Sequence, residues 1–335
     1  MQPDFLVDFP GLGIHDLPIN RVAFELFGRW PVYWYGLLIA FALVLCLLLA
    51  MRHSPKFSLT PDDIMDTFIV IIPLMIVMAR LFYVVFEWAY FSQDLRRIFS
   101  TRDGGLAFYG GVIGGVIAII IITRVKKISL IRLLDFFAVY VPLGQAIGRW
   151  GNFFNQEAFG TNTTLPWGMY SNQTDYYLQY VTRVTGLNPD LPVHPTFFYE
   201  FAANLLIFFW LLRVRKKSTF PLQTTLWYLL LYGVVRYFVE SIRTDPLVIG
   251  DTGIRISMLL SALMVIVSVV FLFVLKRRQQ RLELTRALAG DDVGEADNET
   301  EEAADGDAED ASADFVAIED DQPSDPEKPD KPAAP

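Results

Sequence analysis

Residues 37–50, LLIAFALVLCLLLA, form an apolar run that contains no charged residue and no turn residue. The run lacks the two-residue alternation of a half-buried strand and the 3.6-residue spacing of an amphipathic helix, so all of its faces are apolar. A helix of about 20 such residues crosses the hydrocarbon core of a bilayer. Because 53% of all residues are hydrophobic, the sequence predicts an integral membrane protein.

Seven apolar runs of this kind follow one another along the body of the chain. We expect transmembrane helices at residues 32–51, 64–86, 108–124, 131–148, 197–213, 222–242 and 256–275. The predicted fold class is therefore an all-α polytopic membrane protein with seven spans and a long outer-face loop region at about residues 149–196. The third run opens on the glycine-rich FYGGVIGG, which leaves open an entry from a loop that dips into the membrane.

Every second connection between the runs is basic, whereas the other connections mix acids with bases. Basic loops stay in the cytoplasm, so the N-terminus is predicted to lie outside, the 149–196 connection on the outer face and the C-terminus in the cytoplasm. The basic connections carry Arg52 and Lys56; Arg124, Lys126, Lys127 and Arg132; Arg213, Arg215, Lys216 and Lys217; and Lys276, Arg277, Arg278, Arg281 and Arg286.

The end of the chain differs in composition from the rest. About half of the 37 acidic residues lie from Asp291 onward, in a segment rich in Ala and Pro, which leaves the preceding body basic. Such a segment cannot bury enough apolar surface to fold. We expect two domains, a seven-span membrane domain of residues 1–286 and a disordered acidic cytoplasmic tail of residues 287–335. A solvating role and a partner-binding role for the tail both stay open.

Three arginines interrupt the apolar runs near the predicted outer face. Arg149 lies in GRWGNFFNQEAFG, residues 148–160, where the fourth run ends, and the sixth run contains YGVVRYFVESIR, residues 232–243. In the sixth run Arg236, Glu240 and Arg243 are spaced i, i+4 and i+7, so they share one helical face. Ionisable residues at membrane depth are costly, and a functional role is their default interpretation.

Arginine forks match the geometry of phosphate, the anion that phospholipid headgroups supply. Arg149, Arg236 and Arg243 therefore predict a headgroup site on the outer side of the membrane. The alternative is structural, with the arginines tying helices together through Glu157 and Glu240.

Three other polar or glycine-rich features of the sequence are each open to two interpretations. The glycines at positions 110, 111, 114 and 115 fit either close helix packing or a backbone approach to a headgroup. Arg80 fits a structural ion pair, with Glu87 or Glu200 as candidate partners. His194, in HPTFFYE at residues 194–200, fits a structural hydrogen-bonding role better than a catalytic one.

The stretch GRWGNFFNQEAFG resembles the signature of the prolipoprotein diacylglyceryl transferase family. That pattern is Gly-Arg-x-Gly-Asn-Phe-x-Asn-x-Glu and, after two more residues, Gly, matched here by Gly148, Arg149, Gly151, Asn152, Phe153, Asn155, Glu157 and Gly160. The blocks YWYGLLIA, GGLAFYGG, HPTFFYE and YGVVRYFVESIR are similar to family blocks in the family order. The resemblance covers about residues 20–285 and leaves out the tail.

The resemblance implies the first step of bacterial lipoprotein maturation. In that reaction the diacylglyceryl group of phosphatidylglycerol moves to the thiol of a lipobox cysteine in a prolipoprotein, and glycerol 1-phosphate leaves. The implied partners are phosphatidylglycerol, prolipoprotein signal peptides with a lipobox cysteine and the lipid bilayer, with no nucleic acid. The implied location is the bacterial plasma (inner) membrane, with the active site toward the outer leaflet. Neither a metal nor an organic cofactor is expected, because the reaction needs only a thiolate and charge stabilisation on the departing phosphate.

The family's functional residues carry over to matching positions of this chain. The resemblance implies that Arg149 and Arg236 hold the phosphate or the leaving group as catalytic residues, and that Asn152 and Glu157 shape the site and position the headgroup. Three further residues, Tyr35, Glu240 and Arg243, are assigned with Gly160 to the phosphatidylglycerol site.

The group that accepts the thiol proton stays open at this stage. Many family members carry His before the Gly-Gly of the third block, where this chain has Tyr109, which takes the third catalytic position. A tyrosine is a poor base at neutral pH unless a nearby cation lowers its pKa. The alternatives are Tyr109 activated by an arginine, another group such as Glu157, and thiol activation by electrostatics alone.

Two other functions compete with the transferase. The arginines of a membrane lipid or anion transporter or flippase would bind an anion in transit, and a different headgroup transferase would use the same phosphate site. The charged residues crowd the ends of two runs and no internal repeat stands out, which disfavours a transporter built on repeats.

Overall fold

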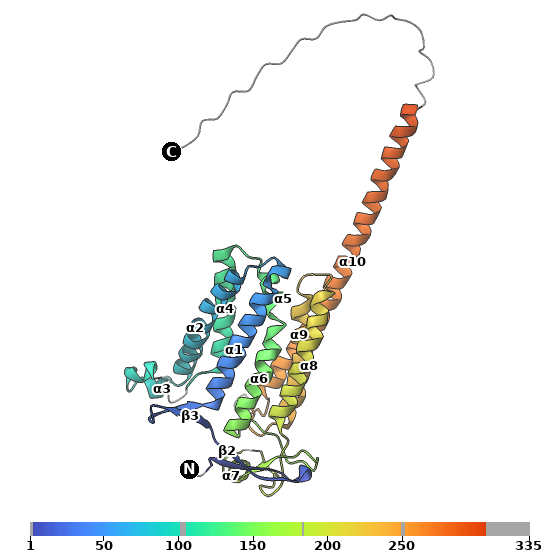
Figure 1. Cartoon of the computed structure of the whole chain (residues 1–335). Coiled ribbons are helices and arrows are strands. Elements are labelled where there is room, and N and C mark those ends of the chain that lie inside the picture. Colours follow the sequence, from blue (N-terminus) through green and yellow to red (C-terminus); the bar gives the residue numbers. More distant parts are fainter. Residues whose placement is uncertain (1–2, 101–104, 183, 249–251, 306–335) are drawn as a thin grey trace, which may run out of the picture. The chain divides into compact units, whose positions relative to one another are not determined.

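The computed structural model describes residues 3–100, 105–182, 184–248 and 252–305, with side chains described as far as residue 288. The chain divides into two compact units, residues 1–279 and 280–335. The first unit is mostly helical (Figure 1). The helices are α1 (Trp34–His53), α2 (Pro61–Phe86), α3 (Trp88–Phe91), α4 (Phe108–Lys126), α5 (Leu130–Phe137), α6 (Tyr140–Asn155), α7 (Asn172–Tyr180), α8 (Thr196–Lys216), α9 (Gln223–Ile242) and α10 (Ile256–Asp305).

Within these described residues, five helices are long and apolar enough to cross a membrane. They are α1 with the 3₁₀ turn Ser54–Phe57, α2, α4, α8 and the part of α10 as far as Leu288. The pair α5 and α6, bent by 41°, makes a sixth if it counts as one span. α9 occupies the sixth predicted run but is not among them, because residues such as Gln223, Arg236 and Glu240 lower its mean hydropathy. The chain is thus a multi-pass membrane protein with five to six candidate spans.

The structure refines two of the predicted runs. The run expected at residues 131–148 is broken between Phe137 and Tyr140, so α5 and α6 are separate helices. The glycine-rich run at 108–124 is one continuous helix, α4, from Phe108 onward.

α4 lies against α2 through its glycines. A Cβ on Gly110 would meet the backbone of Met78 and Ala79, and a Cβ on Gly114 would meet the backbone of Leu74 and Met75. Only glycine allows two helices to approach this closely. The structure therefore favours the helix-packing interpretation of these glycines over a headgroup contact.

The all-α prediction is wrong for the residues before α1, which form strands. β1 (Phe5–Phe9) pairs antiparallel with β2 (Ile14–Ile19) on one side and with β5 (Tyr170–Ser171) on the other. β3 (Val22–Leu26) and β4 (Trp30–Tyr33) form a separate hairpin. Its turn, Phe27-Gly28, has φ of 53° and 62°, the left-handed conformation that two-residue hairpin turns require. These strands are too short for their alternation to stand out in the sequence.

The sheet of β1, β2 and β5 packs with α7 onto one end of the helices, which we call the head end (Figure 1). The sheet contributes Val7 of β1 to a shared core, and the loop before α8 contributes Val193. These pack against Phe153 near the end of α6 and Phe197 near the start of α8. The head end is therefore where α6 finishes and α8 begins.

A second core holds the opposite half of the bundle together, with Leu133, Phe136 and Leu211 buried at its centre. Beside it, Asp135 of α5 accepts hydrogen bonds from the backbone N–H of Leu222 at 2.7 Å and of Thr225 at 2.8 Å. These donors belong to the first turn of α9, which has no internal partner for them. Asp135 thus fixes where α9 begins and so how far along the bundle its later residues lie.

The described part of α10 runs to Asp305, which takes helix into the segment from residue 287 that was predicted to be disordered. The remainder of that predicted tail, residues 306–335, lies outside the described residues. The prediction of a disordered tail is therefore not confirmed.

Candidate functional site

Three helices bring two arginines and two carboxylates together at the head end. Arg149 of α6 forms an ion pair with Glu200 of α8 through Nη2 and Oε2. The other oxygen of Glu200 lies 3.1 Å from Nη1 of Arg236 on α9, and Nη2 of Arg236 lies 2.6 Å from Oε2 of Glu240. We call these four residues the arginine–carboxylate cluster. Glu200 bridges two arginines, and Arg236 bridges two carboxylates.

The carboxylates of the cluster are the more deeply buried partners. Glu200 and Glu240 are each 1% exposed, whereas the side chains of Arg149 and Arg236 are 19% and 17% exposed. Removing a carboxylate from water is costly unless a cation compensates it. The arginines therefore hold the buried acids while part of each guanidinium still faces the accessible side, where a further anion can meet it.

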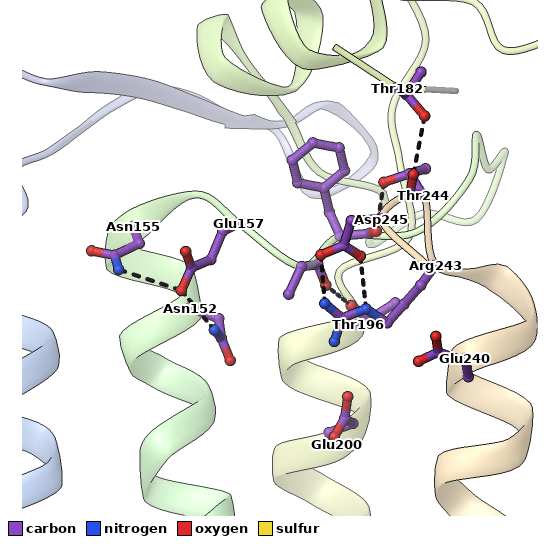
Figure 2. A network of polar contacts seen from close by, with 12 residues as sticks. Asn152, Asn155, Glu157, Thr182, Thr196, Glu200, Glu240, Arg243, Thr244 and Asp245 are labelled. Carbon is purple, nitrogen blue, oxygen red and sulfur yellow. Dashed lines mark hydrogen bonds and ion pairs between the residues drawn. The ribbon is translucent and has the colours of Figure 1, made fainter. Parts of the chain in front are cut away.

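The last turn of α6 adds a set of amides and one exposed acid. Gln156 has φ of 50°, so the chain leaves the helix there and folds Glu157 back over it. Asn152 and Asn155 donate from Nδ2 to Oε1 of Glu157 at 2.9 Å and 3.3 Å (Figure 2). Arg149 in turn donates from Nη1 to Oδ1 of Asn152 at 3.3 Å. A continuous polar path thus joins Glu157 to the arginine–carboxylate cluster.

Arg243 closes the site from the end of α9. Its Nε and Nη2 donate to the two carboxylate oxygens of Asp245 at 2.8 Å and 2.6 Å (Figure 2). Burial acts to lower the pKa of Arg243, but the hydrogen bond to Asp245 and the negative charges of Asp245, Glu200 and Glu240 together raise it, so the group stays charged. Arg255 donates to the backbone carbonyls of Glu240 and Arg243, which ties the start of α10 to the end of α9.

Two glycines of the signature allow this arrangement. Gly160 pairs with Arg243 as an isolated bridge, and a Cβ there would meet His194 and the carbonyl of Ile242. Gly151 faces the ring of Tyr35, so closely that a Cβ would overlap the ring. Gly151 therefore leaves room for the ring of Tyr35, and the lack of a side chain at Gly160 lets its backbone pair with Arg243.

Tyr109 has no contact with the arginine–carboxylate cluster among those of the described residues. Its ring contact in the described part of the chain is with the neighbouring Phe108, at 5.6 Å between centroids, and no ion pair or hydrogen bond there joins it to Arg149 or Arg236. By contrast Arg149, Asn152, Glu157, Arg236, Glu240 and Arg243 all belong to the connected network.

Sequence reasoning missed Glu200 as a member of the site. The signal was present, since Glu200 interrupts an apolar run as Arg149 does, but it was considered only as a candidate partner for Arg80. Arg80 instead donates to the backbone carbonyls of Arg97 and Ile98 and also of Ser100 and Gly105.

His194 has a structural setting next to the site. Its Nδ1 lies 3.0 Å from the hydroxyl of Tyr199, which also accepts a hydrogen bond from Nε1 of Trp167 at 2.8 Å. Burial lowers the pKa of His194, so the neutral form predominates at neutral pH.

The model of the prolipoprotein diacylglyceryl transferase family matches residues 21–274 of this chain. Three curated relatives carry the name phosphatidylglycerol–prolipoprotein diacylglyceryl transferase. The Finegoldia magna protein is 41% identical over 253 residues, which is 75% of this chain and 94% of the relative. The Clostridioides difficile protein is 40% identical over 248 residues, which is 74% of this chain and 92% of the relative. The protein of Streptococcus equi subsp. zooepidemicus is 39% identical over 265 residues, which is 78% of this chain and 97% of the relative.

The match therefore includes every helix from α1 to α9 and each residue of the arginine–carboxylate cluster. The chain belongs to the prolipoprotein diacylglyceryl transferase family.

Proposed function

We propose that this protein transfers the diacylglyceryl group of phosphatidylglycerol to the lipobox cysteine of a prolipoprotein, with glycerol 1-phosphate as the leaving group. The observation that carries the proposal is the pair of arginines, Arg149 and Arg236, held 17–19% exposed by the fully buried Glu200. The names of the relatives add the substrate and the acceptor.

The cluster suits the charge that develops in this reaction. When the carbon–oxygen bond to the phosphate breaks, negative charge collects on the phosphate oxygens. Arg149 and Arg236 are already oriented by Glu200 and Glu240, so they stabilise this charge without first having to be arranged. Such positioning is worth more inside a partly buried site than in water.

The remaining residues of the network surround the headgroup. Asn152 and Glu157 offer an amide and a carboxylate to the hydroxyls of the glycerol headgroup, and the Tyr35 ring lies against Gly151. Arg243 and Gly160 close the site toward the end of α9. Each keeps the substrate role that the family resemblance gives it.

The proposal includes a position in the cell. Seven spans, with α5 and α6 as one bent span and α9 as another, would cross the bacterial plasma membrane. The head end would face the outer leaflet, where the signal peptides of secreted precursors arrive, and the basic connections with the C-terminus would lie in the cytoplasm.

A direct assay tests this function. The full chain is reconstituted in phosphatidylglycerol vesicles with a lipobox peptide, and the peptide mass is followed. We expect a gain of one diacylglyceryl group, no gain when the peptide cysteine is replaced by serine, and no gain with Arg149→Ala. An unmodified cysteine peptide in the presence of folded protein would refute the transferase. Movement of labelled phosphatidylglycerol across the bilayer without peptide would favour the transporter alternative instead.

A further inference from the structure

The proposed reaction needs a group that accepts the proton of the cysteine thiol, because the thiolate is the nucleophile. The sequence left three alternatives: Tyr109 activated by an arginine, another group such as Glu157, and activation of the thiol by electrostatics alone. Tyr109 has no described contact with the arginine–carboxylate cluster. Glu157 is an exposed carboxylate whose Oε1 already accepts two amide hydrogen bonds. Neither arrangement makes a side chain basic, so the rest of the site has to be searched.

The charges around the site are balanced before any substrate arrives. Around the site the described residues include four arginines, Arg149, Arg236, Arg243 and Arg255, and four carboxylates, Glu157, Glu200, Glu240 and Asp245. Arg255 donates to backbone carbonyls and Glu157 accepts from asparagine amides, whereas the other six side chains form ion pairs. The phosphodiester of phosphatidylglycerol adds one negative charge, and a thiolate would add a second. Uncompensated charge in a partly buried site is costly. The thiol proton is therefore best kept inside the site, on one of these carboxylates.

The two buried carboxylates differ in their ion pairs, since Glu200 pairs with two arginines and Glu240 with one in the described part of the chain. Both oxygens of Glu200 are engaged by arginines, one by Arg149 and one by Arg236. Glu240 uses only Oε2, toward Arg236, and its Oε1 has no partner among the described side chains. Tyr232, one turn before Arg236 on α9, lies beside the cluster, close to the charges of Arg149, Arg236 and Glu200.

Substrate binding itself would make Glu240 basic. Among the described residues Arg236 is the arginine that forms an ion pair with Glu240, while Arg243 adds a charge from farther away. A phosphate oxygen that takes donors from Arg236 weakens the Arg236–Glu240 pair. A carboxylate that is 1% exposed and loses part of its compensating charge favours the protonated form. Figure 2 shows Glu240 and Glu200 on neighbouring helices below the Arg243–Asp245 pair, on the side of α9 that faces α8.

We propose that Glu240 is the catalytic residue that accepts the proton of the lipobox thiol. The S–H bond breaks and the proton passes to Oε1 of Glu240, while the thiolate attacks the glyceryl carbon. The C–S bond forms and the C–O bond breaks, with its electron pair remaining on the phosphate oxygen. The proton then passes from Glu240 to the departing glycerol 1-phosphate, which restores the starting charges. This proposal rests on the proposed function.

The test compares two matched variants and two peptides. Glu240→Gln and Glu200→Gln each replace a buried carboxylate that binds Arg236 by an amide of the same shape. One peptide carries the lipobox cysteine, and the other carries selenocysteine, whose selenol is already ionised at neutral pH and needs no base. Lipid extracted from each purified variant reports whether phosphatidylglycerol is still bound and the site is folded.

We expect Glu240→Gln to lower transfer to the cysteine peptide by about 10²- to 10³-fold, as loss of a general base does. Transfer to the selenocysteine peptide should stay within about fivefold of the unaltered protein. The rate of Glu240→Gln with cysteine should rise with pH up to the thiol pKa of about 8.5. Glu200→Gln, which disturbs the arginines, should slow both peptides by the same factor.

An equal loss with both peptides in Glu240→Gln, or no loss with cysteine, would overturn the proposal. If Glu240→Gln fails to bind lipid, Glu240→Asp decides, since a shortened carboxylate should slow the cysteine peptide alone. Failure of the unaltered protein with both peptides would instead refute the transferase function.

Discussion

The helical bundle buries arginine side chains at two places, and the groups that surround the cation differ between them. At the head end, Arg149 and Arg236 pair with carboxylates. Near the other end of α8, about 22 Å farther along the helix, Arg215 lies over aromatic rings. Its guanidinium carbon is 4.6 Å from the centroid of Phe57, 5.4 Å from that of Tyr140 and 5.8 Å from that of Phe136.

The partners of Arg215 are neutral. Its Nη1 donates to the Tyr140 hydroxyl at 3.1 Å, and the same hydroxyl lies 2.9 Å from Nδ1 of His53. No ion pair in the described part of the chain includes Arg215. Ring faces attract the cation but also cover it, so this arginine links α1, α6 and α8 without presenting its fork to a ligand.

The contrast separates a binding arginine from a structural one. Carboxylates beside Arg149 and Arg236 fix the direction of each fork, and both side chains remain partly exposed. Three aromatic rings surround the guanidinium of Arg215. An arginine near the end of an apolar run can therefore serve in binding or in structure. Carboxylate partners indicate the first role and aromatic partners the second.

The largest expected effect comes from removing the shared cation at the head end. Arg236→Ala should lower diacylglyceryl transfer by about 10³-fold and leave Glu200 and Glu240 partly unpaired, which should cost about 3–5 kcal/mol of stability. Transfer rate and thermal unfolding in detergent measure the two effects. The exposed Arg213, at the other end of α8, provides the control. An equal loss of transfer in Arg213→Ala would show that the head-end arginine has no special role.

A smaller effect tests the fit of the head end. Gly151→Ala should displace the Tyr35 ring from beside Arg149 and lower transfer by about 10- to 100-fold, since misplacement of about 1 Å costs up to 10²-fold. At Gly144, two turns earlier on α6, the described residue that a Cβ would meet is Cys46, whose sulfur would lie 3.9 Å away. Gly144→Ala should therefore keep nearly full activity. Equal activities of the two variants would show that the Tyr35–Gly151 contact does not matter.

The aromatic cluster should respond in stability and not in chemistry. Arg215→Ala removes the ring contacts and the hydrogen bond to Tyr140, at a cost of about 2 kcal/mol. The melting temperature should fall while transfer by the folded protein stays within about twofold. A drop in transfer at a temperature well below the new midpoint would place Arg215 in the catalytic machinery and break the comparison.

The smallest effect is a pH dependence at the head end. Burial lowers the pKa of His194 below its ordinary 6.5, so the unfolded chain binds the proton more readily than the folded one. This contribution to stability is complete above pH 6.5 and is lost as the pH falls from there toward the folded pKa. Melting temperatures between pH 8 and 5 should decline less in His194→Gln than in the unaltered protein; parallel curves would contradict this.

Much of the helical part could be predicted from the sequence because apolar runs of 20 residues have few alternative structures in a membrane protein. The strands before α1 could not, since β1 and β5 pair across more than 160 residues and each is short. The break between α5 and α6 was also missed, because both helices are apolar and the break at Ala138 and Val139 adds no polar residue.

The site was predictable in part for a related reason. Arg149, Arg236 and Glu240 stand out because charge is rare in apolar runs, and spacing places Arg236, Glu240 and Arg243 on one helix face. Glu200 belongs to a different helix, and only the three-dimensional packing of α8 between α6 and α9 shows that it bridges both arginines. Spacing within one helix carries no information about such a contact.

The bridging position of Glu200 also has a consequence for how the protein enters the membrane. α6 is synthesised well before α8, and α9 follows α8 by only a short turn. Until α8 arrives, Arg149 has no carboxylate from another helix to compensate it in the bilayer, where a lone charge is costly. We therefore expect α6 to remain near the insertion machinery until α8 and α9 emerge, so that the three helices leave it together as a unit.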